Sequence, residues 1–276
     1  MHPGLFRLGP LEIRFYGLMY VIAIIVGIVL MRREVERKKM GLGKDDVMSY
    51  AFWTVIGGIA GARIYYVLFK WKEFYAQNPF EVFKVWHGGL AIHGGIIGGV
   101  LAAYIYAKVK KVRFFDLTDA TAPMLALGQV FGRFGNFMNG DAHGVPTDLP
   151  WGIVFPKGSI AGDEFPGQPL HPVMLYELVM NLVLFLLLWK LRKRDHKSGF
   201  IFALYLLGYG VIRFFVTFFR ADDLYVGGIR GPHIISTLFI VGSLACILIF
   251  KLWKAQPSKR TSKHKSQAPK KSAARS

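Results

Sequence analysis

Long uncharged apolar runs constrain the fold of this chain more than any other feature. A transmembrane helix needs about 20 predominantly apolar residues, and the chain has seven runs of about that length. They lie at about 16–31, 49–69, 88–107, 117–137, 173–189, 200–219 and 232–250. The first run is short, and polar residues interrupt the fourth. The pattern predicts an all-α polytopic membrane protein with seven transmembrane helices.

Positive charge is concentrated in alternate segments between these runs. The chain has 35 Lys and Arg against 17 Asp and Glu, a formal net charge of +18. Twenty-four of the 35 lie in segments 32–48, 108–116 and 190–199 and in the tail from Lys251. Because basic segments stay on the cytoplasmic side, we expect the N-terminus outside and the C-terminus in the cytoplasm. We expect a membrane domain over 1–253 and a basic, disordered tail over 254–276.

The composition also argues against other classes of protein. A soluble nucleic-acid-binding protein can be this basic, but it would not contain long uncharged apolar runs, so no nucleic-acid partner is expected. The single cysteine excludes an internal disulfide and a multi-cysteine metal site. Cys246 lies in the last run, where we expect a buried small side chain. The chain has no G-x-S-x-G and no H-E-x-x-H, and we expect neither a metal nor a cofactor.

Three arginines, Arg63, Arg133 and Arg213, lie inside or near the apolar runs. An arginine at membrane depth costs at least about 2.5–3.5 kcal/mol on insertion scales, so each one needs a reason. Either the side chain reaches an interface or a distant acid, or the guanidinium groups converge on an anion, which in a bilayer is a phospholipid phosphate. Arg63 fits both interpretations equally, whereas Arg133 and Arg213 favour the second. Glu177 is the simplest partner for one of the three.

Glycine is abundant and often paired. The spacings Gly57–Gly61, Gly94–Gly98 and Gly95–Gly99 predict close helix packing at least as readily as they predict a cavity. The segment WHGGLAIHGG at 86–95 is too rich in glycine for a good helix start. It predicts bent backbone at the outer edge of the membrane, covered by protein or water.

Five blocks of sequence together resemble one protein family. They are YGLMY at 16–20, HGGLAIHGG at 87–95, GRFGNFMNGDAHG at 132–144, HPVMLYE at 171–177 and GYGVIRFFVTFFR at 208–220. The third is closely similar to the signature of the prolipoprotein diacylglyceryl transferases. The resemblance covers most of the chain except the basic tail. It implies a multi-pass enzyme of the bacterial cytoplasmic (inner) membrane, with its active site toward the outer half and seven spans in the orientation expected above.

The resemblance also implies the reaction. The diacylglyceryl group of phosphatidylglycerol would pass to the thiol of the lipobox cysteine in a prolipoprotein signal peptide. Glycerol phosphate would leave, in the first step of bacterial lipoprotein maturation. The partners would be phosphatidylglycerol, prolipoprotein signal peptides and membrane lipids. This chemistry needs an anion clamp, help in ionising the thiol and a cavity open to lipid.

Site residues follow from the resemblance. Arg133 would hold the lipid phosphate, and Arg213 would stabilise charge on the leaving phosphate. His93 is the candidate base for the substrate thiol, whose ordinary pKa of about 8.5 leaves it mostly protonated. A structural histidine at the glycine bend, or a thiolate favoured by the arginines alone, stays open. The other candidate catalytic or phosphate-binding residues are Tyr16, Asn136, Asn139, Asp141 and Gly144.

Several of these residues also have ordinary structural explanations. Tyr16 could belong to an interfacial aromatic belt, and the two asparagines could satisfy the turn that they border. Gly144 is expected to serve a backbone conformation. Asp141 stands where family members commonly have Glu, and Thr217 stands where some have Glu, so Thr217 is assigned no role.

Two other functions compete with the transferase. One is a transporter or flippase that passes an anion, and the other is a non-catalytic lipid-binding scaffold. The common transporter designs contain internal repeats, and none is evident here. The GRFGNFMNGD block favours the transferase over both.

Overall fold

The computed structural model describes residues 4–8, 11–221 and 225–255. The expected tail, 254–276, therefore lies almost wholly outside the described residues. The long helices of the described part are α1 Phe15–Lys38, α2 Lys44–Phe69, α3 Ile92–Val109, α4 Phe114–Asn139, α6 Val173–Leu191, α7 Phe200–Thr217 and α8 Gly231–Phe250.

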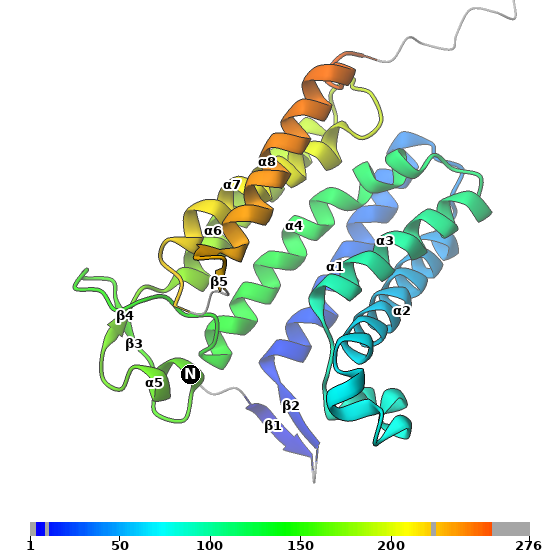
Figure 1. Cartoon of the computed structure of the whole chain (residues 1–276). Coiled ribbons are helices and arrows are strands. Elements are labelled where there is room, and N and C mark those ends of the chain that lie inside the picture. Colours follow the sequence, from blue (N-terminus) through cyan, green and yellow to red (C-terminus); the bar gives the residue numbers. More distant parts are fainter. Residues whose placement is uncertain (1–3, 9–10, 222–224, 256–276) are drawn as a thin grey trace, which may run out of the picture.

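The helix α4 forms the centre of the bundle. It contacts α1, α6 and α7, while α2 pairs with α3 and α7 pairs with α8. Figure 1 shows α1, α2 and α3 on one side of α4 and α6, α7 and α8 on the other. The arrangement brings helices from both halves of the sequence around a single polar helix.

Among the described residues, six helices are long and apolar enough to cross a membrane, namely α1, α2, α3, α6, α7 and α8. This confirms a helical, polytopic membrane protein. The helix α4 is as long as α2, at 26 residues, but it is more polar. Because α4 is surrounded by other helices, its Asp119 and Thr118 are buried in protein and need not meet lipid.

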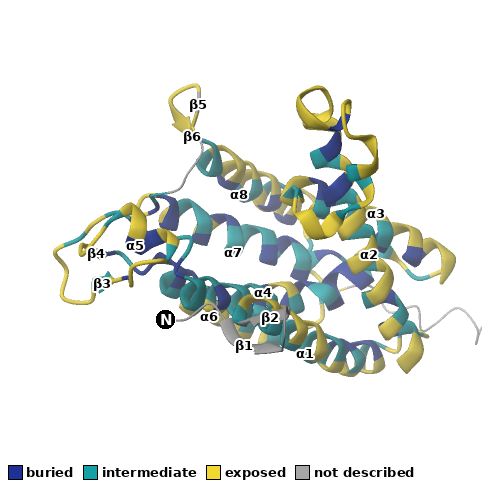
Figure 2. Cartoon of the chain, turned by 90° about the horizontal axis from the view of Figure 1, so that it is seen from below, coloured by how far each residue is buried: buried dark blue, intermediate teal, exposed yellow. Residues whose placement is uncertain are grey.

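Outward faces of the peripheral helices are apolar. Figure 2 shows exposed residues along α2, α3 and α8, and Ile96, Leu101 and Ile249 are among them. The prediction that Cys246 is buried was wrong, because its side chain is exposed. The helix α8 packs on α7 along one face only, and Cys246 lies off that face.

Glycines allow α2 and α3 to touch backbone to backbone. A Cβ added at Gly98 would lie 2.2 Å from the carbonyl oxygen of Gly57, and one at Gly61 would lie 2.3 Å from that of Gly94. Both distances are too short for any side chain to be accommodated without movement of the backbone. The small-residue spacing therefore serves close packing, as one of the two interpretations expected.

Several helix boundaries differ from the apolar runs. The helix α1 continues through Arg32 and Arg37 to Lys38, because straight-chain basic residues are good helix formers and need only leave the apolar layer. The helix α3 begins at Ile92, after Gly88 and Gly89 adopt positive φ. The glycine-rich segment thus bends as expected, although its last glycines lie inside the helix.

Short elements fill the connections. Three two-stranded antiparallel sheets pair β1 Gly4–Leu8 with β2 Leu11–Arg14, β3 Ile153–Val154 with β4 Pro169–Leu170, and β5 Tyr225–Val226 with β6 Ile229–Arg230. A short helix, α5, spans Ile160–Glu164, and three single turns of π or 3-10 helix cover Trp71–Tyr75, Pro79–Phe83 and Val85–His87. The connection between α4 and α6 is tied down by Trp151, whose indole donates to the Tyr176 hydroxyl at 2.7 Å.

Candidate active site

Glu177 is the centre of a buried cluster of charges. Its side chain is fully buried in the second turn of α6. Arg133 Nη2 lies 2.6 Å from Glu177 Oε2, an ion pair whose angles are not those of a hydrogen bond. Arg213 Nη1 and Arg220 Nη1 donate to Oε1 at 3.3 Å and 3.1 Å. Three guanidinium groups from α4, α7 and the turn after α7 therefore share one carboxylate.

The donors of this cluster suit an additional anion. All three arginines contact Glu177, so the arginines that the sequence left without a nearby acid have a counter-charge in the fold. Planar guanidinium groups are well suited to phosphate oxygens, so the cluster can receive a phosphate without losing Glu177.

A series of hydrogen bonds runs from Arg133 along the end of α4. Its Nη1 donates to Asn136 Oδ1 at 3.3 Å, and Asn136 Nδ2 donates to Asp141 Oδ1 at 2.7 Å. Asn139 Nδ2 donates to the other oxygen of Asp141, also at 2.7 Å. The residues 133 and 136 share a helix face because they are three apart. Asp141 therefore holds one N–H of each asparagine and, through Asn136, orients Arg133.

A left-handed glycine makes this geometry possible. The helix α4 ends at Gly140, whose φ is +67°, and the amide of Asp141 donates to the carbonyl of Asn136 at 3.2 Å. The chain then turns back, which brings the Asp141 carboxylate beside the last turn of the helix it has just left. Backbone amides of Gly140 and Asp141 donate to carbonyl groups at the end of α4. The asparagine side chains are therefore not needed to satisfy those carbonyls.

Arg220 is the residue of the cluster that the sequence pattern missed. That pattern assigns it no role, yet it is only 6% exposed and bonds Glu177. The spacing of seven residues from Arg213 to Arg220, two helical turns, was the available signal. Arg220 lies beyond the end of α7, in a turn whose backbone bridges Gly144.

Gly144 fixes the backbone of Arg220. The two residues form an isolated antiparallel bridge, Gly144 N–H donates to the His171 carbonyl at 3.1 Å, and a Cβ on Gly144 would lie 2.7 Å from the Phe219 carbonyl. Its role is thus close backbone contact, as expected. Burial lowers the pKa of His171 below its ordinary value, so this imidazole is neutral at pH 7 and adds no charge beside the cluster.

Thr217 occupies the position where a second carboxylate was considered. It is fully buried, and its hydroxyl donates to the Arg213 carbonyl at 2.6 Å. Its own carbonyl accepts a hydrogen bond from Arg230 Nη1. Thr217 thus satisfies its hydroxyl within α7, and Glu177 is a carboxylate that bonds Arg213.

A cavity of about 560 Å³ adjoins Arg133 between α1, α2, α4 and α7. Tyr16, Asn136 and Tyr209 lie on its wall with Arg133, and aliphatic residues such as Ile24 and Leu125 line the rest. Tyr16 bonds the Tyr20 hydroxyl at 2.9 Å, and its ring fits against Gly135, where a Cβ would lie 2.9 Å from the ring. A polar end and apolar walls suit a lipid headgroup and the start of its chains.

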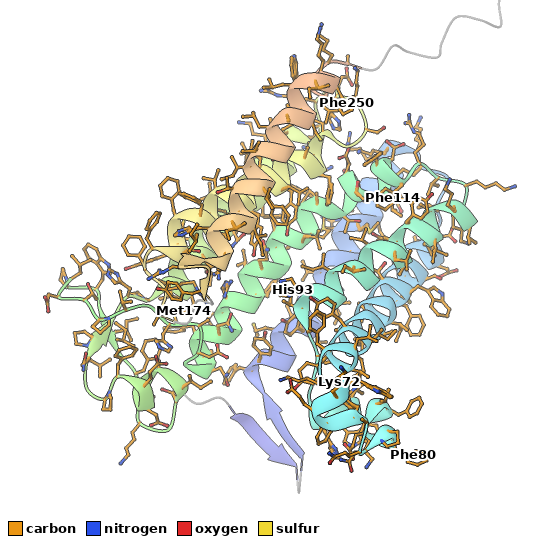
Figure 3. The ribbon with its side chains drawn as sticks, viewed as in Figure 1. Lys72, Phe80, His93, Phe114, Met174 and Phe250 are labelled. Carbon is orange, nitrogen blue, oxygen red and sulfur yellow. The ribbon has the colours of Figure 1, made fainter. Side chains whose placement is uncertain are left out.

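His93 lies apart from the arginine cluster. It is exposed in the first turn of α3, where Figure 3 labels it, and its ring centroid is 6.0 Å from that of Tyr65. Among the described residues it forms neither an ion pair nor a hydrogen bond with any of the three clustered arginines. The preceding residue, Ile92, does line the 560 Å³ cavity, so His93 stands beside that cavity rather than among the charges.

Arg63 holds the connection between α2 and α3 in place. It is buried and donates to the carbonyls of Val82 at 2.9 Å and Gly88 at 2.5 Å, as well as to others of the same connection. These bonds hold the turns between α2 and α3 against the end of α2. Neither interpretation of Arg63 named these backbone carbonyl partners, and of the three arginines singled out in the sequence, Arg133 and Arg213 join the cluster.

These features define a polytopic helical membrane protein with a buried, phosphate-compatible arginine cluster beside a lipid-sized cavity. A family model described as prolipoprotein diacylglyceryl transferase matches residues 3–249. The chain is 43% identical over 280 residues to the phosphatidylglycerol–prolipoprotein diacylglyceryl transferase of Fusobacterium nucleatum, covering 88% of this chain and 96% of that protein. It therefore belongs to the prolipoprotein diacylglyceryl transferase family.

Two further relatives carry the same name. The Geobacter sulfurreducens protein is 40% identical over 253 residues, covering 90% of this chain and 95% of that protein. The Synechococcus elongatus protein is 39% identical over 262 residues, covering 92% and 90%. The family expected from the signature residues is confirmed, and so is the assignment as a membrane transferase of lipoprotein biosynthesis.

Proposed function

We propose that this chain transfers the diacylglyceryl group of phosphatidylglycerol to the thiol of the lipobox cysteine of prolipoproteins. The observation that carries the proposal is the convergence of Arg133, Arg213 and Arg220 on one buried carboxylate, beside a cavity with apolar walls. Membership of the family and the names of the relatives supply the substrates. Those names do not mention the lipobox cysteine or the glycerol phosphate product, so both are part of the proposal.

The reaction is a displacement at carbon. The substrate sulfur forms a bond to the glycerol carbon that carries the phosphate ester, and the carbon–oxygen bond breaks. Its electron pair leaves with glycerol phosphate, which gains one negative charge, and the thiol proton must go to a base. Arg133 would hold the phosphate before transfer, and Arg213 would stabilise the added charge as it forms. No protein nucleophile is required.

The supporting residues act mainly by position. Glu177 and the Asp141–Asn136 pair orient the guanidinium groups, and Tyr16 would bond the headgroup from the opposite wall. One N–H of Asn136 and one of Asn139 are not used by Asp141 and are available to phosphate or glycerol oxygens. Gly144 would contribute through the backbone of the turn that carries Arg220.

The thiol proton has two possible destinations. His93 stands beside the cavity and could accept it when a substrate peptide lies between His93 and the cluster. Alternatively, the three guanidinium groups favour the thiolate directly, because nearby positive charge lowers the pKa of a thiol. The separation of His93 from the arginines means that substrate binding would have to join the two.

We also propose the topology. The helix α4 would be the seventh span, shielded from lipid by its neighbours, in a bacterial inner-membrane protein with its N-terminus outside and its C-terminus in the cytoplasm. Basic residues at the ends of α1, α3 and α6 support this orientation. The active site would then lie toward the outer half. Labelling of Lys157→Cys and Lys44→Cys with an impermeant maleimide, in a Cys246→Ser background in intact spheroplasts, tests it. Only Lys157→Cys should react.

The transferase proposal is tested by its product. Purified protein is incubated with phosphatidylglycerol and a peptide that carries a lipobox cysteine, and the peptide is analysed by mass. A diacylglyceryl thioether is expected, together with glycerol phosphate. Absence of the adduct, with a known relative active under the same conditions, would overturn the proposal. It would favour an anion transporter or a lipid-binding scaffold.

A further inference from the structure

A second, basic cavity lies at the opposite end of the helices from Arg133. It has a volume of about 460 Å³ and lies where α1, α3 and α6 end and α4 begins. Arg113 precedes α4 and Arg133 follows about 20 residues later, so the two sites are about 30 Å apart at 1.5 Å per residue. Figure 3 shows Phe114 and Phe250 near this end and Met174 near the other.

The lining of this basic cavity is strongly positive. Eight Lys or Arg side chains and two aspartates line it. Arg37 and Arg192 pair with buried Glu34, and Arg113 pairs with Asp116 at 2.6 Å. Even with Glu34 and the nearby buried Asp119 included, four positive charges are in excess. Among the described residues, four of the lining side chains form no ion pair: Lys39, Lys111, Lys193 and Arg194.

Arg192 is a fixed, buried part of the cavity wall. It is only 6% exposed, and its guanidinium lies 3.4 Å from the centre of the Trp189 ring. Its Nε is buried and has no hydrogen-bond partner among the described residues. The guanidinium is thus held in place by Glu34 and Trp189, and its charge would attract an anion in the cavity.

An apolar groove adjoins the basic cavity. It has a volume of about 1080 Å³ and runs between α3 and α4 on one side and α7 and α8 on the other. Phe114, Leu206 and Phe239 contribute to its walls, and Val112, Arg113 and Ser198 line both spaces. The two spaces therefore meet, with positive charge at the end of the bundle and an apolar surface along its length.

We infer that the basic cavity and the groove together bind one anionic glycerophospholipid. The phosphate lies among the lysines and arginines, and the acyl chains lie along the groove. Charge alone would admit inorganic phosphate, but only a lipid explains why the groove opens from the same place. The site is separate from the candidate active site and does not depend on the transferase reaction. The proposed topology places it in the cytoplasmic leaflet.

Cys246 provides a reporter for this site. It is the single cysteine of the chain, it is exposed, and it lines the groove. Its alkylation by N-ethylmaleimide, followed by intact mass in nonionic detergent, measures how open the groove is. Phosphatidylglycerol at ten times its Kd should slow the alkylation about tenfold, since the rate follows the unoccupied fraction. Phosphatidylcholine with the same chains, and inorganic phosphate, should leave the rate unchanged.

Charge variants test the phosphate end. Lys111 and Lys193 are exposed, so the double variant Lys111→Gln/Lys193→Gln should fold, and it should lose most of the protection by phosphatidylglycerol. The matched control is Lys44→Gln, which alters an exposed lysine of the same end that lines neither space. It should keep the protection.

Three results would overturn the inference. Equal protection by phosphatidylcholine would mean an unselective apolar groove, and protection by inorganic phosphate would mean a free-anion site. Full protection in the double variant would mean that the basic cavity takes no part. The alkylation rate requires no turnover, so failure here leaves the transferase proposal standing. An inactive protein that shows the protection leaves this inference standing.

Discussion

Arg220 Nη1 donates a hydrogen bond to Glu177 Oε1 at 3.1 Å, and both side chains are buried. This contact joins the turn after α7 to α6 and brings a third arginine to a carboxylate that already serves Arg133 and Arg213. Removal of one partner from a buried ion pair leaves an uncompensated charge, which is strongly destabilising. The Glu177–Arg220 pair therefore links the stability of this end of the bundle to the geometry of the proposed phosphate site.

Glu177→Gln should reduce both stability and turnover. The loss of the shared counter-charge is expected to cost about 3–5 kcal/mol of stability, and displaced guanidinium groups should lower kcat about 10²-fold. Thermal unfolding in detergent and the rate of adduct formation measure the two effects. The control is Glu73→Gln, which breaks an exposed pair with Lys70 that water screens and that should contribute little to stability. Equal behaviour of the two variants would contradict the central place of Glu177.

Arg220→Lys should separate positioning from lipid binding. A lysine keeps the charge but cannot reproduce the planar fork, so we expect kcat to fall while KM for phosphatidylglycerol changes less than threefold. Arg220→Gln should lower kcat further, since it also removes the charge. Steady-state kinetics with varied lipid distinguish the outcomes. A large rise in KM at unchanged kcat would show instead that Arg220 binds the lipid directly and does not act through Glu177.

His93→Gln tests the destination of the thiol proton. If His93 is the base, the variant should lose the acid limb of the profile of kcat/KM against pH, because that limb reports the protonation of the base. Activity at high pH, where the substrate thiol ionises unaided, should recover in part. An unchanged profile would assign thiol activation to the arginine cluster and leave His93 with a structural role at the start of α3.

Gly98→Ala should destabilise the α2–α3 pair. The added methyl group would lie 2.2 Å from the Gly57 carbonyl oxygen, so the helices must move apart, at an expected cost of about 1–3 kcal/mol. Gly99→Ala is the matched control, because its Cβ would meet nothing closer than 3.8 Å. The two variants are compared by thermal unfolding in the same detergent. Similar unfolding temperatures would refute the backbone contact.

The sequence predicted the class of protein and the long helices, because apolar periodicity and charge alternation are local signals. Arg133 and Arg213 were identifiable because a charge inside an apolar run is conspicuous. Arg220 was not, since its burial depends on the turn after α7 folding back onto Gly144, which no local pattern records. The exposure of Cys246 likewise depends on which face of α8 packs on α7. The position of His93 relative to the arginines depends on how α3 packs against α4.

The most direct test of the central claim is the rate of thioether formation by Arg133→Ala, measured with phosphatidylglycerol and a lipobox peptide. Arg63→Ala is its matched control, because Arg63 also lies in a long helix, but its partners within the described part of the chain are backbone carbonyls of the adjoining connection and the Tyr75 ring. We predict that Arg133→Ala loses about 10²–10³ in kcat, while the folded fraction of Arg63→Ala keeps the rate of the unaltered protein. Full activity in Arg133→Ala would contradict the assignment of the arginine cluster as the phosphate site.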